Sequence, residues 1–219
     1  MKFFDGYRCS RCELEVPAGS IAGECPACAA PLLAEYDLGG LRRAVTREEF
    51  FSTGAGVWRF RHLLPSLGRE VSLGEGNTPI IHARRLGARL GIDHLYIKNE
   101  ALNPTGSFKA RGMAVAMTRL LDIGVAAASM PTAGNAGLAL SAYGAAAGVG
   151  SKIYIPDGTP AGIAEECRQY GADVVHVPGS IADAAARLDE EAGTDRTGVV
   201  STFREPCRVE GKKTIAFEI

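Results

Sequence analysis

The sequence predicts an α/β protein whose doubly wound, mainly parallel sheet carries a small metal-binding appendage at its N-terminal end. Short apolar segments alternate with helix-length segments through residues 124–219, which is typical of strands joined by crossover helices. A Gly-containing turn at residues 132–137 joins one such strand to the next helix. Two Cys-x-x-Cys pairs fall within residues 1–28. At 219 residues the chain is long enough for one α/β core and such an appendage.

The charge balance excludes several classes of partner. The chain has 24 basic and 25 acidic residues and a net charge of −1, so it lacks the electrostatic signature of a protein that binds nucleic acid or an anionic membrane. Residues 1–8 are too few and too polar for a signal sequence, and no apolar run reaches membrane-spanning length. We therefore expect a cytoplasmic protein without a nucleic-acid or membrane partner.

Four of the six cysteines are spaced as metal ligands. Cys9 pairs with Cys12 and Cys25 pairs with Cys28, and the two pairs are separated by a stretch of hairpin length. In a chain without a secretion signal, this arrangement predicts a tetrahedral zinc site, rather than redox-inert or oxidised cysteines. With four protein ligands the zinc ion would be structural. Residues 1–38 are therefore interpreted as a zinc-ribbon-like segment that ends in a strand near residues 31–38.

Residues 39–72 are expected to form a helical connecting arm. Gly39 and Gly40 mark its boundary with the ribbon. Thr46 and Glu49 have the spacing of a capping box, which predicts the start of a helix. Apolar side chains are expected to dock the segment on the main body, namely Trp58, Phe60, Leu63 and Leu64.

Residues 73–219 are expected to form the α/β domain. A loop at residues 73–81 leads into a short strand, and a helix at residues 84–90 and a strand at residues 95–98 follow. The later strands are expected at residues 124–130, 152–156, 173–177 and 198–201. The helices that follow them are expected to start near residues 132, 160, 181 and 210. Strands separated by helices of this length favour parallel pairing.

The stretch at residues 103–112 places a lysine in the opening turn of a helix that runs to about residue 121. Thr105 or Ser107 is expected to cap this helix. Lys109 would then lie near the positive end of the helix dipole and beside Arg111, and both lower the pKa of an amine. The neutral amine is the form that attacks a carbonyl group. On these features alone, an ordinary solvated lysine is the alternative.

A second candidate loop, at residues 132–135, lies where a strand passes into a helix. Open α/β sheets bind ligands at the carboxyl ends of their strands. Gly134 permits close backbone approach, and N–H groups at the start of a helix bind anions such as a carboxylate. Asn135 could equally be a capping residue.

A basic cluster at residues 204–213 precedes the last predicted helix. Cations are unfavourable near the positive end of a helix dipole, whereas a dianionic phosphate is favoured there. The cluster therefore suggests a phosphate site, and a solvated basic face is the alternative.

Residues 103–112 closely resemble the cofactor-lysine motif of the pyridoxal-phosphate enzymes of the tryptophan-synthase-β superfamily, which have fold type II. Within that superfamily they look most like threonine synthases, whose motif commonly reads N-P-T-G-S-F-K-D-R-G. This chain has Ala110 where Asp is usual, and threonine and serine dehydratases also carry an uncharged residue there. Residues 74–79, 132–135 and 204–214 are similar to the family's G-E-G-x-T-P, S-x-G-N and K-E-P-Y-R-x-E-G-K-K-T elements.

The resemblance implies roles for individual residues. Lys109 would be the catalytic lysine that binds the cofactor aldehyde, and Asn135 would donate to the phenolic oxygen of the cofactor. Arg208 would contact the substrate phosphate. The implied cofactor-binding residues are Phe108, Lys109 and Asn135. The implied substrate-binding residues are Thr132, Arg208 and Lys212.

A member of this group would convert O-phospho-L-homoserine and water to L-threonine and phosphate, with pyridoxal phosphate as cofactor and a structural zinc ion. Its substrate would be a small amino acid, and full-length relatives would be homodimers. The resemblance covers nearly all of this chain but only the N-terminal part of the proteins in that family. No glycine-rich G-G-G-T or G-x-G-G loop, which cradles the cofactor phosphate in the family, occurs in the sequence, so we expect an incomplete fold-type-II sheet and a truncated gene product. A serine/threonine dehydratase or other β-replacement enzyme is one alternative, and a non-catalytic fragment is another.

Overall fold

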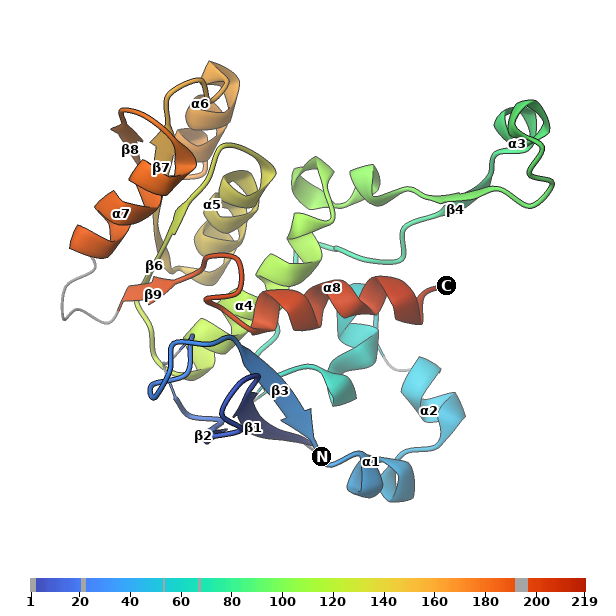
Figure 1. The fold of residues 1–219 in the computed structure, drawn as a ribbon. Coiled ribbons are helices and arrows are strands. Elements are labelled where there is room, and N and C mark those ends of the chain that lie inside the picture. Colours follow the sequence, from blue (N-terminus) through green and yellow to red (C-terminus); the bar gives the residue numbers. More distant parts are fainter. Residues whose placement is uncertain (1–2, 21–22, 53, 67, 192–196) are drawn as a thin grey trace.

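The computed structural model describes residues 3–20, 23–52, 54–66, 68–191 and 197–219. Within these residues the chain forms three separate sheets, of three, two and four strands. The four-stranded sheet is parallel throughout, and helices cover both of its faces (Figure 1). The predicted α/β class, with an appendage at the N-terminal end, is confirmed. None of the described helices is long and apolar enough to span a membrane.

The N-terminal appendage is a small antiparallel sheet. Its strands are β1 (Phe4–Cys9), β2 (Glu15–Pro17) and β3 (Leu32–Tyr36), with β1 in the middle. β3 lies in the region predicted to be a strand. Buried Phe4 and Tyr7 pack edge to face, with ring centres 5.1 Å apart, so the appendage has an apolar base. The Tyr7 hydroxyl also lies 3.2 Å from the thiol of Cys207, which joins the appendage to the main body.

Short helices follow the appendage. They are α1 (Leu38–Ala44), α2 (Arg47–Ser52) and the 3-10 helix η1 (Gly56–Leu63). The predicted capping box is present, because the Thr46 N–H donates to the Glu49 carboxylate and the Glu49 N–H donates to Thr46 Oγ1. Trp58 is buried, and its indole N–H donates to the Val71 carbonyl at 3.0 Å. The segment docks on the main body as expected, while the three domain boundaries drawn from the sequence stay predictions.

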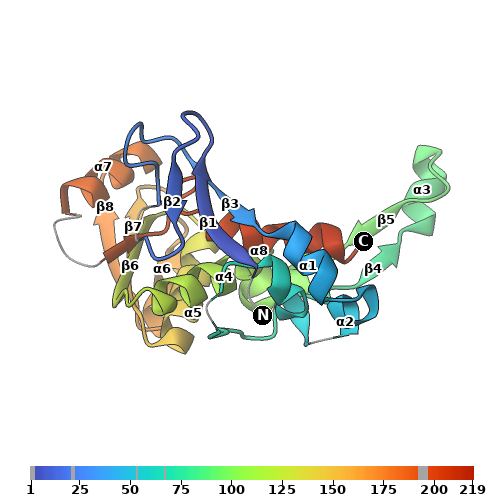
Figure 2. The same ribbon diagram turned by 90° about the horizontal axis from the view of Figure 1, so that it is seen from below.

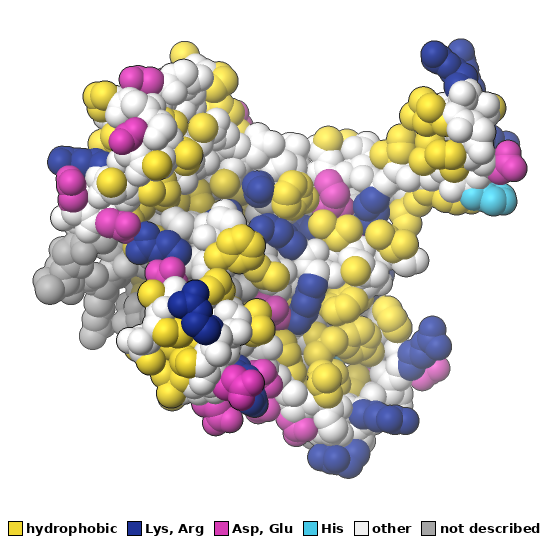
Figure 3. Space-filling view, viewed as in Figure 1, with side chains coloured by type: hydrophobic (Ala, Val, Ile, Leu, Met, Phe, Trp, Pro, Cys, Tyr) yellow, Lys and Arg dark blue, Asp and Glu magenta, His cyan; other side chains and the backbone are white. Residues whose placement is uncertain are grey.

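An arm projects from the main body (Figures 1 and 2). It consists of β4 (Ile80–His82), α3 (Arg84–Leu90) and β5 (Tyr96–Lys98), and β4 pairs with β5 in antiparallel fashion. Apolar side chains gather on its surface (Figure 3). Those at least 44% exposed on this arm are Ile80, Ile81, Leu86, Leu90, Ile92, Tyr96 and Ile97.

The four-stranded sheet has the order β8-β7-β6-β9. Its strands are β6 (Ala127–Pro131), β7 (Gly150–Pro156), β8 (Asp173–Val177) and β9 (Thr197–Val199). Three helices pack against it, namely α5 (Asn135–Ala147), α6 (Ala161–Gln169) and α7 (Ile181–Glu191). α7 lies on one face, and α5 and α6 lie on the other (Figure 2). Helices on both faces make the sheet doubly wound, as predicted.

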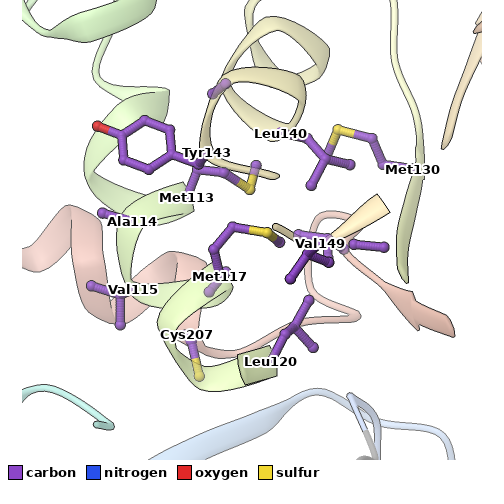
Figure 4. Close-up of a cluster of buried hydrophobic side chains, with 14 of the residues drawn as sticks. Met113, Ala114, Val115, Met117, Leu120, Met130, Leu140, Tyr143, Val149 and Cys207 are labelled. Atoms are coloured by element: carbon purple, nitrogen blue, oxygen red, sulfur yellow. The ribbon is translucent and has the colours of Figure 1, made fainter. Parts of the chain in front are cut away.

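The core lies where α4 (Lys109–Asp122) packs against α5 and against α8 (Cys207–Phe217). Figure 4 shows Met113 and Met117 of α4 directed toward Leu140 and the other apolar side chains of this cluster. Both methionines are fully buried. The apolar face of α4 therefore fixes the position of its first residue, Lys109, relative to the sheet.

One element starts earlier than the sequence indicated. α8 begins at Cys207, whereas the helix was expected near residue 210. The Glu205 carboxylate accepts hydrogen bonds from the backbone N–H groups of Cys207 and Arg208, at 2.9 and 2.7 Å. These bonds satisfy N–H groups at the start of the helix, and they bring Arg208 into its first turn.

Candidate active site

The lysine-containing segment makes a tight turn before α4. It passes through two short 3-10 helices, η2 (Glu100–Leu102) and η3 (Pro104–Gly106). Thr105 and Gly106 have φ values of 61° and 67°, in the left-handed region. The Lys109 N–H donates to Ser107 Oγ at 3.4 Å, whereas Thr105 Oγ1 has no partner among the described residues. The N-cap position of α4 is Phe108, so Ser107 precedes the cap but still accepts from the first N–H of the helix, and the expected alternative of a Thr105 cap is wrong.

The glycine-rich loop at residues 73–79 supports this turn. The Asn103 side chain accepts from the Gly76 N–H at 2.9 Å and donates to the Glu100 carbonyl at 2.9 Å. Behind the loop, the fully buried Glu75 carboxylate accepts from the Tyr143 hydroxyl at 2.6 Å. The loop at residues 73–79 is thus hydrogen-bonded to the turn that directly precedes Lys109.

Helices α4 and α8 cross at a pair of glycines. A Cβ atom added to Gly211 would stand 2.1 Å from the Arg111 carbonyl oxygen, and one added to Gly112 would stand 2.7 Å from the Arg208 carbonyl oxygen. Only glycine allows the two backbones to come this close. The crossing brings Lys109, at the start of α4, next to Arg208 and Lys212 on the first turns of α8.

Burial and neighbouring positive charge lower the pKa of both lysines. Burial and the charge of Arg208 lower the pKa of Lys109. Burial, followed by the charges of Arg208 and Lys109, lowers the pKa of Lys212 to about 8. The Lys109 ammonium lies 4.3 Å from the centre of the Phe108 ring, and that of Lys212 lies 5.9 Å from the same ring. The direction of the Lys109 shift agrees with the sequence argument, but its expected cause does not: burial and Arg208 lower the pKa, whereas the charge of Arg111 is paired with Glu100 and Glu218.

The cluster has little compensating negative charge. Within the described residues, neither Lys109 nor Lys212 forms an ion pair with a carboxylate. Arg208 is buried, and its guanidinium donates to the Val200 carbonyl at 2.9 Å. Glu205 is nearby, but its carboxylate is bonded to backbone N–H groups, and burial raises its pKa. The site is therefore suited to an added anion.

The second predicted loop lies at the carboxyl edge of the parallel sheet. Thr132 follows β6, and Val200, the acceptor for Arg208, follows β9, the neighbouring strand. Thr132 is buried, and its hydroxyl accepts from the Gly134 N–H at 3.3 Å, so the loop presents the start of α5. Asn135 is the exposed first residue of that helix. In the described part of the chain, no hydrogen bond joins Thr132 or Asn135 to the lysine cluster, so their roles stay predictions.

A buried ion network directly behind Lys109 was missed by the sequence reasoning. Arg111 is fully buried and forms ion pairs with Glu100 and Glu218, both at 2.7 Å. Lys98 of β5 also pairs with Glu218, at 2.6 Å. Burial acts to raise the pKa of Glu218, but hydrogen bonds from Arg111 and Lys98 outweigh it and lower the pKa to about 2. The sequence signal that could have revealed this network was Arg111 itself, an arginine near the start of a helix whose face is otherwise apolar.

The four N-terminal cysteines converge as predicted. Their Sγ atoms all lie within 4.8 Å of one another. The Sγ atoms of Cys9 and Cys28 are 3.5 Å apart, and those of Cys12 and Cys25 are 3.6 Å apart. Four sulfurs about 2.3 Å from a tetrahedral zinc ion stand about 3.8 Å from each other, so the arrangement fits zinc. N–H groups of Cys12 and Arg11 donate to the Cys9 sulfur and lower the pKa of that thiol to about 6, which favours the thiolate form.

Comparisons with known proteins agree with this geometry. A family model described as "Pyridoxal-phosphate dependent enzyme" matches residues 71–219, which include the lysine cluster and the parallel sheet. The threonine synthase of Methanosarcina acetivorans is 33% identical over 213 residues, covering 97% of this chain and 52% of that protein. The threonine synthase of Methanocaldococcus jannaschii is 37% identical over 215 residues, covering 97% of this chain and 53% of that protein.

The fold is also found among solved structures. Diaminopropionate ammonia lyase from Escherichia coli superposes with a TM-score of 0.61 at 21% identity, covering 67% of this chain and 44% of that one. This likeness concerns the fold alone. The chain spans about half the length of the two threonine synthases that it resembles.

Proposed function

The chain belongs to the family of pyridoxal-phosphate-dependent enzymes, and from that premise we propose that it takes part in the conversion of O-phospho-L-homoserine and water to L-threonine and phosphate. The observation that carries the proposal is the cluster of Lys109, Arg208 and Lys212. It combines an amine of lowered pKa with two further cations that lack a carboxylate ion pair within the described residues. The similarity to two threonine synthases supports the same reaction.

The residues present fit the cofactor at its aldehyde end. Lys109 is half-buried beside the exposed ring of Phe108, and its lowered pKa favours the neutral amine that a carbonyl group requires. Lys109 would hold the cofactor and, once released by the substrate amine, would accept and return protons at the substrate carbon atoms. When bound, pyridoxal phosphate supplies electron withdrawal from those carbons. Asn135, at the start of α5, would orient the ring.

Arg208 and Lys212 are proposed to bind the phosphate of the substrate. A dianion placed between them would meet two cations and the N-terminal end of α8, where the helix dipole also favours negative charge. The same groups would stabilise the phosphate as it departs. The N–H groups at the start of α5, next to Thr132, would receive the substrate carboxylate.

The two cations Arg208 and Lys212 favour a phosphorylated substrate over serine or threonine. Two buried cations without a counter-ion lower the stability of the folded protein. An enzyme that acts on an unphosphorylated amino acid would carry this cost beside its catalytic amine without any benefit in substrate binding. We therefore assign the substrate class as a γ-phosphorylated amino acid.

Cofactor binding can be tested on the 219-residue chain itself. Pyridoxal phosphate is added to the wild-type protein, to Lys109→Ala and to Lys152→Ala, a surface lysine paired with Glu191. We expect a visible absorption band with the wild type and with Lys152→Ala, and none with Lys109→Ala. Borohydride reduction followed by peptide mass spectrometry should place the adduct on Lys109. An adduct on Lys212, the neighbouring amine of lowered pKa, would overturn the assignment.

The reaction class needs a separate measurement. Phosphate release from O-phospho-L-homoserine and keto-acid formation from serine and threonine are compared with the cofactor-loaded protein. Release of phosphate with formation of threonine supports the proposal. Keto acid from serine or threonine, without phosphate release from O-phospho-L-homoserine, would instead identify a dehydratase.

A further inference from the structure

Arg119 is a buried cation whose guanidinium has no hydrogen-bond partner in the described part of the chain. It lies near the C-terminal end of α4, far along the helix from Lys109, and is only 2% exposed. None of its three guanidinium nitrogens has a hydrogen-bond partner among the described residues. The Phe4 ring gives this charge weak support, because its centre is 5.9 Å from the guanidinium carbon, and Tyr7 is a further aromatic neighbour. A buried charged group left unpaired is costly, and such a group indicates that an ion or water belongs beside it.

Arg119 lines a cavity of about 210 Å³ between the N-terminal appendage and the α/β body. The appendage contributes Tyr7, Ser20, Gly23 and Glu24, and the body contributes α4, β9 and the turn before α8. A buried water needs roughly 10–15 Å³ of such volume, so the cavity has room for a small ion together with water. Gly23 lines one side of the cavity and packs closely against the Arg204 backbone, since an added Cβ would stand 1.8 Å from the Arg204 carbonyl oxygen.

The other charged groups of the cavity are already paired. Arg204 donates to Glu24 at 3.1 Å and to Asp189 at 2.6 Å. Glu205 accepts from the N–H groups at the start of α8. Glu24, Arg204 and Glu205 thus all have partners. Among the described charged residues of the lining, Arg119 is the one whose charge is not compensated by an ion pair or a hydrogen bond.

We propose that this cavity binds a small oxyanion of the size of phosphate or sulfate, with Arg119 as its charged ligand. A planar guanidinium matches two oxygens of such an ion and gives strong charge-assisted hydrogen bonds. The bound ion would join the appendage to the body at a position remote from Lys109. The inference does not rest on the proposed function, because none of its residues belongs to the lysine cluster.

Calorimetric titration of inorganic phosphate into the full chain tests the site. The variants are Arg119→Gln, Lys212→Gln, which alters the other anion-binding cluster, and Arg187→Gln, which removes an exposed arginine on α7. We expect Arg119→Gln to weaken one binding event by about tenfold or more, as the loss of a charge-assisted pair implies. Lys212→Gln and Arg187→Gln should keep that event. Equal phosphate affinity for the wild type and a folded Arg119→Gln would overturn the proposal.

A second measurement decides the matter if Arg119→Gln does not fold. Wild-type crystals are soaked in selenate, a tetrahedral oxyanion whose anomalous scattering marks its position. We expect an anomalous peak within hydrogen-bond distance of the Arg119 guanidinium. Ordered water alone at this position, with selenate bound elsewhere in the same crystal, would contradict the inference.

Discussion

Gly211 of α8 lies directly against Gly112 of α4, so that a Cβ atom on Gly211 would stand 2.7 Å from the Gly112 Cα and 2.1 Å from the Arg111 carbonyl oxygen. These contacts are with backbone atoms, which cannot rotate away as a side chain could. The distance between the two helices therefore depends on both residues lacking a side chain. Lys109, Arg208 and Lys212 are neighbours only because this distance is short.

Gly211→Ala should destabilise the protein by about 1–3 kcal/mol, since an added methyl group forces the helices apart. It should also weaken pyridoxal phosphate binding, because the lysine cluster would open. Urea unfolding and absorbance titration measure the two effects. Gly162→Ala is the matched control, since no atom lies within 4 Å of the Cβ position of Gly162 on α6. That change should stabilise the helix by about 0.5–1 kcal/mol, and an equal loss in both variants would show that the crossing is not special.

Lys212 should make the stability of the protein rise with pH. Its pKa is about 8 in the folded chain and near 10.5 in the unfolded chain, so between these values the unfolded state holds more protons. The unfavourable charge is fully present below about pH 8 and is relieved as the pH rises toward 10.5. The wild type should therefore gain unfolding free energy relative to Lys212→Met between pH 7 and pH 9, so that its deficit relative to the variant shrinks.

Lys152→Met is the control for this experiment. The hydrogen bond with Glu191 raises the pKa of Lys152, so this lysine stays charged in both states across the same range. Its contribution to the unfolding free energy should not change between pH 7 and pH 9. A pH-independent difference for Lys212→Met as well would mean that the amine titrates normally.

Glu218→Gln should be strongly destabilising. It leaves the buried Arg111 with one carboxylate fewer, and breaking a buried ion pair typically costs about 3–5 kcal/mol. The contribution of Glu218 is present above pH 4.5 and is lost as the pH falls toward its folded pKa of about 2. Urea unfolding at pH 7 and pH 3 should show a smaller effect of the substitution at pH 3. Glu190→Gln, on the exposed surface of α7, should change little at either pH.

Zinc content tests the four-cysteine site. The purified chain should hold one zinc ion, measured by elemental analysis, and Cys12→Ser should lose it, because three thiolates bind the ion less tightly than four. Cys167→Ser, in a cysteine buried in α6, should keep the zinc. Retention of zinc by Cys12→Ser would point to a different ligand set.

Local patterns carried most of the fold. The strand and helix alternation gave a parallel sheet, and the spacing of Thr46 and Glu49 gave a capping box, because each depends on residues near one another in the chain. The start of α8 was placed three residues late, since the capping carboxylate of Glu205 precedes a proline and resembles a loop residue in sequence. Strand order could not be read from the chain, because it is set by contacts between distant segments.

The candidate site divides in the same way. Lys109 was found from its position at the head of a helix, and the four cysteines were found from their spacing. The network of Arg111 and Glu218 was missed, since the two residues are 107 positions apart and neither belongs to a local pattern. Arg119 was missed for a related reason, as an arginine in a helix is ordinarily assumed to reach solvent. Its burial follows from the docking of the appendage, which no helical periodicity encodes.

The arm formed by β4, α3 and β5 has a practical consequence for handling the protein. Its apolar side chains are exposed to water, and among the described strands β4 and β5 pair only with each other, which leaves one edge of each unpaired. Such a surface favours reversible self-association, which increases with protein concentration and with the concentration of salts that are excluded from protein surfaces. Dilute, low-salt buffers should therefore keep the chain monodisperse in light scattering, and concentrated stocks should turn cloudy first.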